Sequence, residues 1–317
     1  MDKLTKPLLY LMQTPTLLSI GLGVLLLIVQ TVESNLDPSI QITFFLFFLF
    51  STGIPHGALD HLVEEKTAQR QQKTYSFTAF TAKYLATMAI YGLAWYVSPT
   101  LSLLFFLLIS AWHFGETDLE NVPFTIGWSV ARFSLGGLVL SILLLTHAEE
   151  VTPIWTRIVQ NNEIALSFWQ FSADYRFFLL VSWALFFAAS FIVSYRQSVI
   201  VINKARLLRL VCVLVLTYFL PLLPAFALYF GGWHALNSFH SIQKYLIENE
   251  PTTVKSALTI WSKALPFTLI ALIFSSFSVW CWQRFLQSWD FIPLLFIFLS
   301  LVTLPHLNVM HYVNQRK

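Results

Sequence analysis

The sequence predicts an all-α protein, a polytopic transmembrane bundle of about ten helices. Three observations indicate this class: 56% of the 317 residues are hydrophobic, only 11% are charged, and the mean hydropathy is +0.67. A soluble protein of this length has too little interior for so much apolar surface, whereas lipid-facing helices require it. Because no polar stretch is long enough for a separate soluble domain, residues 1–317 are expected to form a single integral membrane domain.

Ten apolar segments are long enough, or nearly long enough, to cross a bilayer as helices. In chain order they are Thr16–Val32, Ile40–Pro55, Phe77–Val97, Thr100–Gly115, Phe124–Thr146, Phe177–Tyr195, Leu207–Leu222, Pro224–Leu246, Leu265–Trp282 and Phe291–Tyr312. The second, fourth and seventh segments are short, which indicates tilting or shelter inside the bundle. The apolar stretch that holds the seventh and eighth is too long for one helix, and Pro221 and Pro224 predict a tight reversal within it.

The distribution of lysine and arginine predicts the orientation. With both termini cytoplasmic, the inner side holds Lys3, Lys6, Lys66, Arg70, Lys73, Arg196, Lys204, Arg206, Arg209, Lys244, Lys255, Lys263, Arg316 and Lys317. The outer side holds only Arg157, Arg176 and Arg284. This asymmetry follows the positive-inside rule and predicts a multi-pass protein of the inner (cytoplasmic) membrane. The net charge of +3 is spread through the loops and does not indicate a nucleic-acid partner.

Seven of the eight histidines fall, on this topology, toward the cytoplasmic side of the apolar segments; the exception is His147. Polar groups inside membrane segments are costly, and by default they indicate function. Three pairs are five or six residues apart, whereas only three- and four-residue separations share a helix face well. The pairs are therefore poor two-ligand clamps, and one imidazole from each of several helices is the expected arrangement.

A metal site near the cytoplasmic side is the function that this set of histidines favours. The candidate ligands are His56, His113 and His234, with either His240 or His306 as the fourth. Neutral imidazoles suit iron, zinc, copper and nickel.

Carboxylates stand close to two of these histidines in the sequence. Asp60 follows His56 by four residues, and Glu116 follows His113 by three. These spacings place a carboxylate one helical turn away, where it could orient an imidazole. We therefore assign Asp60 and Glu116 as supporting residues of a catalytic site.

Glycine, proline and tryptophan flank the same histidines. Pro55-His56-Gly57 and Gly231-Gly232 indicate a loosened helix and close approach of another backbone or a ligand. Trp112 and Trp233 each directly precede a candidate ligand and are the best aromatic candidates for lining a substrate cavity.

Four motifs carry a resemblance to a known family. They are Gly53-Ile54-Pro55-His56-Gly57-Ala58-Leu59-Asp60-His61, Trp112-His113-Phe114-Gly115-Glu116-Thr117-Asp118, Trp233-His234 and Leu304-Pro305-His306. In this order they resemble the Brp/Blh family of membrane-bound β-carotene 15,15'-dioxygenases. The resemblance implies oxidative cleavage of the central double bond of β-carotene by O₂ to give two all-trans retinal, with non-haem Fe(II) held by histidines. It also suggests a rhodopsin as the acceptor of the retinal.

The same resemblance implies that His56, His113 and His234 are iron ligands. The family pattern has a further histidine one turn after the Trp-His pair, where this chain has Ser238. The resemblance therefore leaves three arrangements: His240 completes the site, His306 completes it, or the site has three ligands.

Three other functions are compatible with intramembrane histidines. A two-iron lipid desaturase or hydroxylase normally needs HxxxH and HxxHH clusters, which this chain lacks. A transporter, or a channel for protons or metal ions, would use the histidines as a relay. A bis-histidine haem b electron carrier would show Soret absorption.

Overall fold

The computed structural model describes residues 15–160, 162–198, 200–248, 252–285 and 291–315. These residues form helices and no strand, which confirms the all-α prediction. The elements are α2 (Pro15–Val32), α3 (Pro38–Phe48), η1 (Leu49–Gly53), α4 (Ile54–Gly57), α5 (Asp60–Arg70), α6 (Phe77–Val97), α7 (Pro99–Asp118), α8 (Ile126–Leu145), α9 (Ala148–Val159), α10 (Glu163–Asp174), α11 (Arg176–Arg196), α12 (Lys204–Phe219), α13 (Leu222–Tyr229), η2 (Phe230–Ala235), α14 (Leu236–Ile247), α15 (Val254–Phe285) and α16 (Phe291–Gln315). The terminal cations used to predict the orientation, Lys3, Lys6, Arg316 and Lys317, lie outside the described residues.

Seven helices within the described residues are long and apolar enough to cross a membrane. They are Pro15–Val32, Pro38–Arg70, Pro99–Asp118, Ile126–Leu145, Arg176–Arg196, Val254–Ser278 and Ile292–Asn314. The other three predicted segments correspond to α6, to α12 and to the run α13–η2–α14. The predicted reversal is confirmed, because α12 ends at Phe219, Pro221 directly precedes α13, and α13 packs back against α12. The count of ten crossings and the orientation stay predictions.

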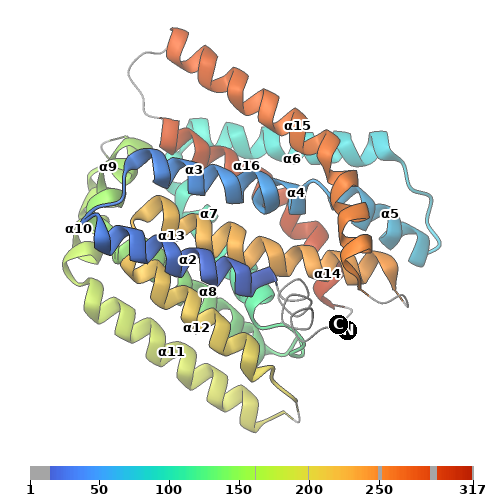
Figure 1. The fold of residues 1–317 in the computed structure, drawn as a ribbon. Helices are drawn as coiled ribbons and strands as arrows, with labels where there is room; N and C mark the ends of the chain where they lie inside the picture. Colours follow the sequence, from blue (N-terminus) through green and yellow to red (C-terminus); the bar gives the residue numbers. More distant parts are fainter. Residues whose placement is uncertain (1–14, 161, 199, 249–251, 286–290, 316–317) are drawn as a thin grey trace.

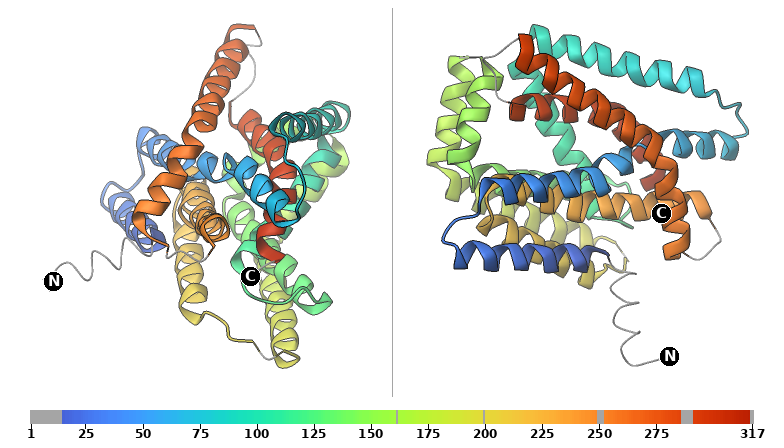
Figure 2. Two further views of the ribbon diagram at one scale, coloured as in Figure 1. Left: turned by 90° about the vertical axis from the view of Figure 1, so that its right-hand side faces the viewer. Right: turned by 45° about the horizontal axis from the view of Figure 1, so that its top comes forward.

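Most of the long helices run side by side in one bundle (Figure 1). The short helices α9 and α10 lie together at one end of this bundle, and α5 and α14 lie toward the opposite end. Helix α15 crosses the outside of the bundle, and the two further views show its N-terminal part bending away from the rest of the helix (Figure 2). Pro266 lies inside α15, where a proline removes a backbone hydrogen bond and kinks a helix.

Polar residues fix where several helices begin. Asp37, Ser76, Thr125, Asn162 and Asn203 each cap an N-terminus by accepting a hydrogen bond from a backbone N–H in the first turn. Such caps satisfy donors that have no partner within the helix, typically for about 1 kcal/mol each. The turns between the helices are therefore encoded locally.

Two glycines bring α7 and α8 into backbone contact. A Cβ atom on Gly115 would collide with the carbonyl group of Arg132, and one on Gly136 would collide with the carbonyl group of Ala111. Only glycine allows two helices to approach this closely. The contact holds the C-terminal part of α7, which carries the second sequence motif, against α8.

Candidate metal centre

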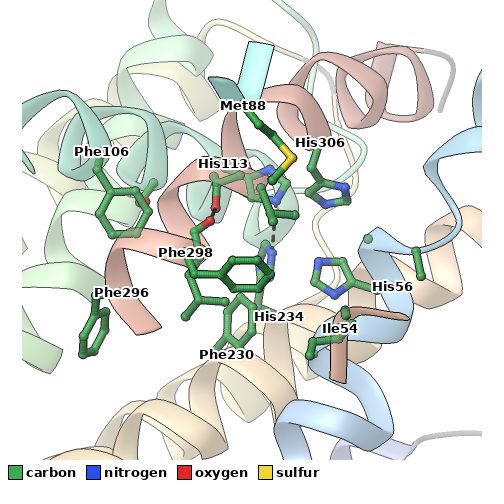
Figure 3. Close-up of a pocket in the computed structure, with 18 of the residues that line it drawn as sticks. Ile54, His56, Met88, Phe106, His113, Phe230, His234, Phe296, Phe298 and His306 are labelled. Atoms are coloured by element: carbon green, nitrogen blue, oxygen red, sulfur yellow. Dashed lines mark hydrogen bonds between the residues drawn. The ribbon is translucent and has the colours of Figure 1, made fainter. Parts of the chain in front are cut away.

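Four histidines from four different segments meet inside the bundle (Figure 3). His56 lies on α4, His113 on α7, His234 on η2 and His306 on α16. All four are buried, with exposed fractions of 4%, 3%, 0% and 4% in that order. Each segment supplies one imidazole, in the manner expected from the spacing of the histidines.

The distances between the imidazoles fit a shared ion. The ring centroids of His56 and His306 are 4.8 Å apart, those of His113 and His306 5.2 Å, and those of His113 and His234 4.7 Å. One ring nitrogen from each of His56, His113 and His306 lies within 4.8 Å of the others. The Nε2 atoms of His113 and His234 are 3.2 Å apart. Two imidazole nitrogens bound to one ion at about 2.1 Å lie about 3.0 Å apart at right angles and about 3.4 Å apart in a tetrahedron.

Several ring nitrogens of this cluster have no partner among the described protein atoms. These atoms are Nδ1 of His113, Nδ1 of His234 and Nε2 of His306. A buried polar atom without a partner costs about 1–3 kcal/mol, so native proteins leave very few of them. Since one ring gives one nitrogen to one ion, the atoms that point to a guest are the unpartnered Nε2 of His306 and the Nε2 atoms of His113 and His234, which contact only each other. The donor set, all neutral imidazole nitrogen, suits iron, copper, nickel or zinc.

Asp60 orients one of the four rings. Its Oδ1 atom lies 2.7 Å from Nδ1 of His306, and its Oδ2 atom accepts a hydrogen bond of 3.2 Å from the hydroxyl of Tyr84. Asp60 is only 2% exposed. A carboxylate on one ring nitrogen fixes the tautomer and leaves the other nitrogen, here Nε2, available to a metal ion. The sequence placed Asp60 beside His56, whereas its hydrogen-bond partner is 246 residues away.

Two π-helical segments position two of the other rings, His56 and His234. η1 leads into α4 and His56, and η2 contains His234. η2 packs so closely against the end of α3, just before η1, that a Cβ atom on Gly231 would lie 2.6 Å from Cβ of Phe48. The hydroxyl of Thr52 in η1 lies 3.0 Å from the carbonyl oxygen of Gly231 in η2. Such π-helical turns occur frequently at functional sites, and here the predicted loosening around both glycine motifs takes this form.

A buried polar network holds η2 from its other face. Asp118 at the end of α7 accepts hydrogen bonds from Nε1 of Trp233 at 2.7 Å and from the hydroxyl of Tyr229 at 2.9 Å. Arg206 of α12 donates to Oδ1 of Asn237 and to the carbonyl oxygen of Thr117, both at 2.8 Å. The end of α7, α12 and the segment around His234 are therefore locked together.

Four other residues that the sequence assigned to the site lie away from the four imidazoles. Trp112 and Trp233 are not among the described residues that line the cavity beside the cluster. The reason is helical geometry, since neighbouring residues on a helix point about 100° apart and a residue next to a cavity-facing histidine faces elsewhere.

Glu116 is buried, and its Oε1 atom contacts Nδ1 of His311 at 3.2 Å. His240 is half-buried and, within the part of the chain that the structure describes, does not line the cavity, whereas His306 does.

An apolar cavity of about 500 Å³ adjoins the cluster. This volume lies in the range of small-molecule pockets, about 300–1,000 Å³. Most of its wall is aliphatic and aromatic, and the acidic and imidazole groups in it are Asp60, His56, His61, His113, His234 and His306. Figure 3 shows Met88, Phe106, Phe230, Phe296 and Phe298 around the cavity together with the four imidazoles. The arrangement can hold a long apolar molecule against a polar centre.

Sequence reasoning missed Tyr84 and Thr52. Tyr84 lies in the middle of α6 and binds Asp60, while Thr52 links η1 to η2. Neither residue belongs to a motif with a recognisable spacing. The only signal is that each hydroxyl lies in an apolar run, where a polar group needs a partner.

Comparison with known proteins identifies the family of this chain. A family model described as "Beta-carotene 15,15'-dioxygenase" matches residues 47–314. A curated relative from uncultured marine bacterium 66A03, named "Beta-carotene 15,15'-dioxygenase", is 25% identical over 263 residues, which cover 82% of this chain and 90% of the relative. No solved structure matches this chain. Because the family model covers most of the chain, including all four histidine motifs, the protein belongs to the beta-carotene 15,15'-dioxygenase family.

Proposed function

We propose that this protein cleaves the central double bond of β-carotene with O₂ and releases two molecules of all-trans retinal. The observation that carries the proposal is the set of four buried imidazoles, one from each of four segments, in the wall of an apolar cavity. Membership of the family supports the substrate and the reaction class.

The proposed reaction is balanced without a further reductant. The carbon–carbon double bond breaks, and each of its two carbons gains one atom of the same O₂ molecule as a carbonyl oxygen. Both products are aldehydes, so no proton and no leaving group is consumed or released. No nucleophilic side chain is therefore needed.

We assign the metal site to iron(II), with His56, His113, His234 and His306 as the ligands. When bound, iron(II) supplies the one-electron chemistry that allows O₂ to react with an alkene. His306 is preferred to His240 as the fourth ligand because its Nε2 atom has no protein partner and its Nδ1 atom is held by Asp60. Asp60 is thus a positioning residue. Glu116, bound to His311, remains a proposal for support of the site through α7.

The chain's own residues position the substrate and exclude water. A polyene has no polar group for recognition along its length, so the cavity wall must hold it by shape and apolar contact. A rigid wall converts the meeting of the reacting double bond and the site into an oriented encounter. Burial of all four imidazoles keeps bulk water away from the reacting atoms.

The location follows from the substrate as well as from the sequence. β-Carotene dissolves in the bilayer, so we place the protein in the inner membrane, with both termini in the cytoplasm and lateral access for the carotenoid between helices. A rhodopsin is the acceptor of the retinal that this setting suggests.

Retinal formation in cells that accumulate β-carotene tests the proposal. The intact protein is expected to give about two retinal per carotene lost. His113→Ala and His306→Ala are expected to abolish both retinal and stoichiometric iron, because removing even a hydrogen-bond partner of a metal-bound histidine typically costs about 10–100-fold in metal affinity, and a ligand itself costs more. His240→Ala is the matched control, since that histidine does not line the cavity. Undiminished retinal from His113→Ala would refute the assignment, and loss only in His240→Ala would move the fourth ligand to that residue.

A further inference from the structure

The cavity has two unlike ends. Toward α9 its wall includes Val151, Trp155 and Ile158, which are only 5%, 8% and 5% exposed. Toward α6 and α15 its wall includes Leu85 and Ile270, which are 57% and 62% exposed on the outer surface of the bundle. The cavity is therefore closed at α9 and open to the side between α6 and α15.

The closed arm runs from the histidines along α7 and α16. Leu103 and His113, ten residues apart on α7, both line the cavity, as do Phe296 and His306, ten residues apart on α16. At about 1.5 Å per residue, the arm extends about 15 Å along each helix. Figure 3 shows Phe106 and Phe296, which line this arm, on the side of the cluster away from His56.

The length of the closed arm matches half of a carotenoid. Carbon–carbon bonds of about 1.4 Å advance about 1.2 Å each in an extended trans polyene, so half of β-carotene, from its central bond to the far edge of its ring, spans about 15 Å. A molecule whose ring reaches the closed end therefore presents its central double bond at the level of the histidines.

The end wall is built to be rigid. The indole of Trp155 stacks on that of Trp169 in α10, with ring centroids 4.9 Å apart, and its Nε1 atom donates to the carbonyl oxygen of Ala165 at 3.1 Å. Helix α9 also packs against the ends of α7, α8 and α16, which surround the arm. A fixed wall, unlike a mobile loop, can define a distance.

We propose that α9 is a molecular ruler: Trp155 and Ile158 stop the ring of the carotenoid and so determine which double bond lies at the histidines. The inference rests on the proposed function and adds the specificity-determining residues to it. It requires a ring or another bulky apolar group at the buried end, and it leaves the other half of the substrate free to vary within the open arm.

A carotenoid truncated on one side tests the ruler on the unaltered protein. The probe is β-apo-8'-carotenal, which keeps one ring and ends in an aldehyde on its shortened half. Its ring suits the apolar closed arm and its aldehyde does not. The ruler therefore predicts that the cleaved bond lies at the same distance from the ring as in β-carotene, which gives retinal together with a short dialdehyde. Cleavage at the midpoint of the shortened polyene would overturn the ruler.

Changes in the end wall should move the cleaved bond in opposite directions. Ile158→Ala shortens the side chain by about two carbon–carbon bonds, so the end wall recedes by about 2.5 Å. This length equals one repeat of a double and a single bond in the polyene. The ring-bearing product is then expected to become longer by one repeat, whereas Val151→Phe, which fills the arm, is expected to shorten it. Ile164→Ala, at an α10 residue that is 83% exposed and does not line the cavity, is the matched control and should leave retinal as the product.

The outcomes separate the ruler from the proposed function. Loss of stability lowers the total amount of product but cannot change its length, so a direction of shift is specific to the ruler. Retinal as the sole product of both wall variants would refute the ruler and leave the proposed function intact. Absence of cleavage by the unaltered protein would refute the proposed function and, with it, the ruler.

Discussion

Replacing Asp60 tests whether the histidine cluster is a metal site that depends on an orienting carboxylate. Asp60 is buried and makes a 2.7 Å contact to Nδ1 of His306, which leaves Nε2 of that ring without a protein partner. Asp60→Asn retains an oxygen that can accept the same hydrogen bond but removes its charge. Asp60→Ala removes both, and the hydroxyl of Tyr84 also loses its acceptor.

The expected magnitude follows from the hydrogen bond. A charged acceptor makes a hydrogen bond worth about 1.5–3 kcal/mol, roughly twice a neutral one. At 1.4 kcal/mol for each factor of ten, Asp60→Ala is expected to weaken iron binding by about 10–100-fold. Asp60→Asn is expected to weaken it by about tenfold or less, since the orientation of His306 survives. Losses of this size are typical when a partner of a metal-bound histidine is removed.

The assay is iron retained per protein, measured after dialysis against a graded series of chelator concentrations. It needs no turnover, so it remains informative if activity is lost for another reason. Asp174→Asn is the matched control, because that carboxylate is exposed on α10 and accepts a hydrogen bond only from Gln170 among the contacts described for it. Equal iron retention in Asp60→Ala and in the unaltered protein would refute the reasoning.

Three further predictions concern the framework of the site. Gly136→Ala forces α8 away from the carbonyl group of Ala111 and should lower the free energy of unfolding by about 1–3 kcal/mol, measured by thermal unfolding. Gly21→Ala, where a Cβ meets no atom within 4 Å, should leave the stability unchanged or raise it slightly. Equal melting temperatures of the two variants would contradict this prediction. Asp118→Asn leaves one of two buried donors without an acceptor and should cost about 1–3 kcal/mol, with Trp233 fluorescence reporting the change. The Arg70 guanidinium holds the pKa of Glu248 below its ordinary value of 4.5. The stabilisation from the contact between Arg70 and Glu248 is therefore fully present above pH 4.5 and is lost as the pH falls through the lower pKa of the folded state. Protection of the amides at the end of α14 against hydrogen exchange, taken relative to their intrinsic rate at each pH, should therefore fall in acid, and Glu248→Gln should show the lower protection already at neutral pH.

The positions of the histidines could be predicted because their signal is local. An imidazole in an apolar run is conspicuous, and the length of each run places it at an approximate depth. Most helix ends could be predicted for the same reason, since caps, prolines and changes in hydropathy lie within a few residues of one another. The sequence left the fourth position open between His240 and His306, because both lie on segments of suitable depth.

Contacts between distant segments could not be predicted from one sequence. Asp60 was assigned to the ring four residues before it, yet its hydrogen bond is to His306, on a helix that follows almost the whole chain. Glu116 likewise contacts His311, 195 residues away, a partner that helical spacing does not reveal. Helical spacing limits which residues share a face, but the choice of partner depends on how the helices pack.

The same distinction explains why the two tryptophans were assigned to the cavity. Adjacency in sequence means proximity in a loop, but on a helix it separates two side chains by about 100°. The indole of Trp233 accordingly binds Asp118 on a face of η2 that does not line the cavity, while His234 meets His113. One segment thus carries two tasks on two faces: a hydrogen-bonded anchor to the rest of the bundle, and an imidazole held at a fixed position in the cavity wall. A cluster assembled from four segments needs such anchors, because each imidazole is placed only as accurately as its own backbone is held.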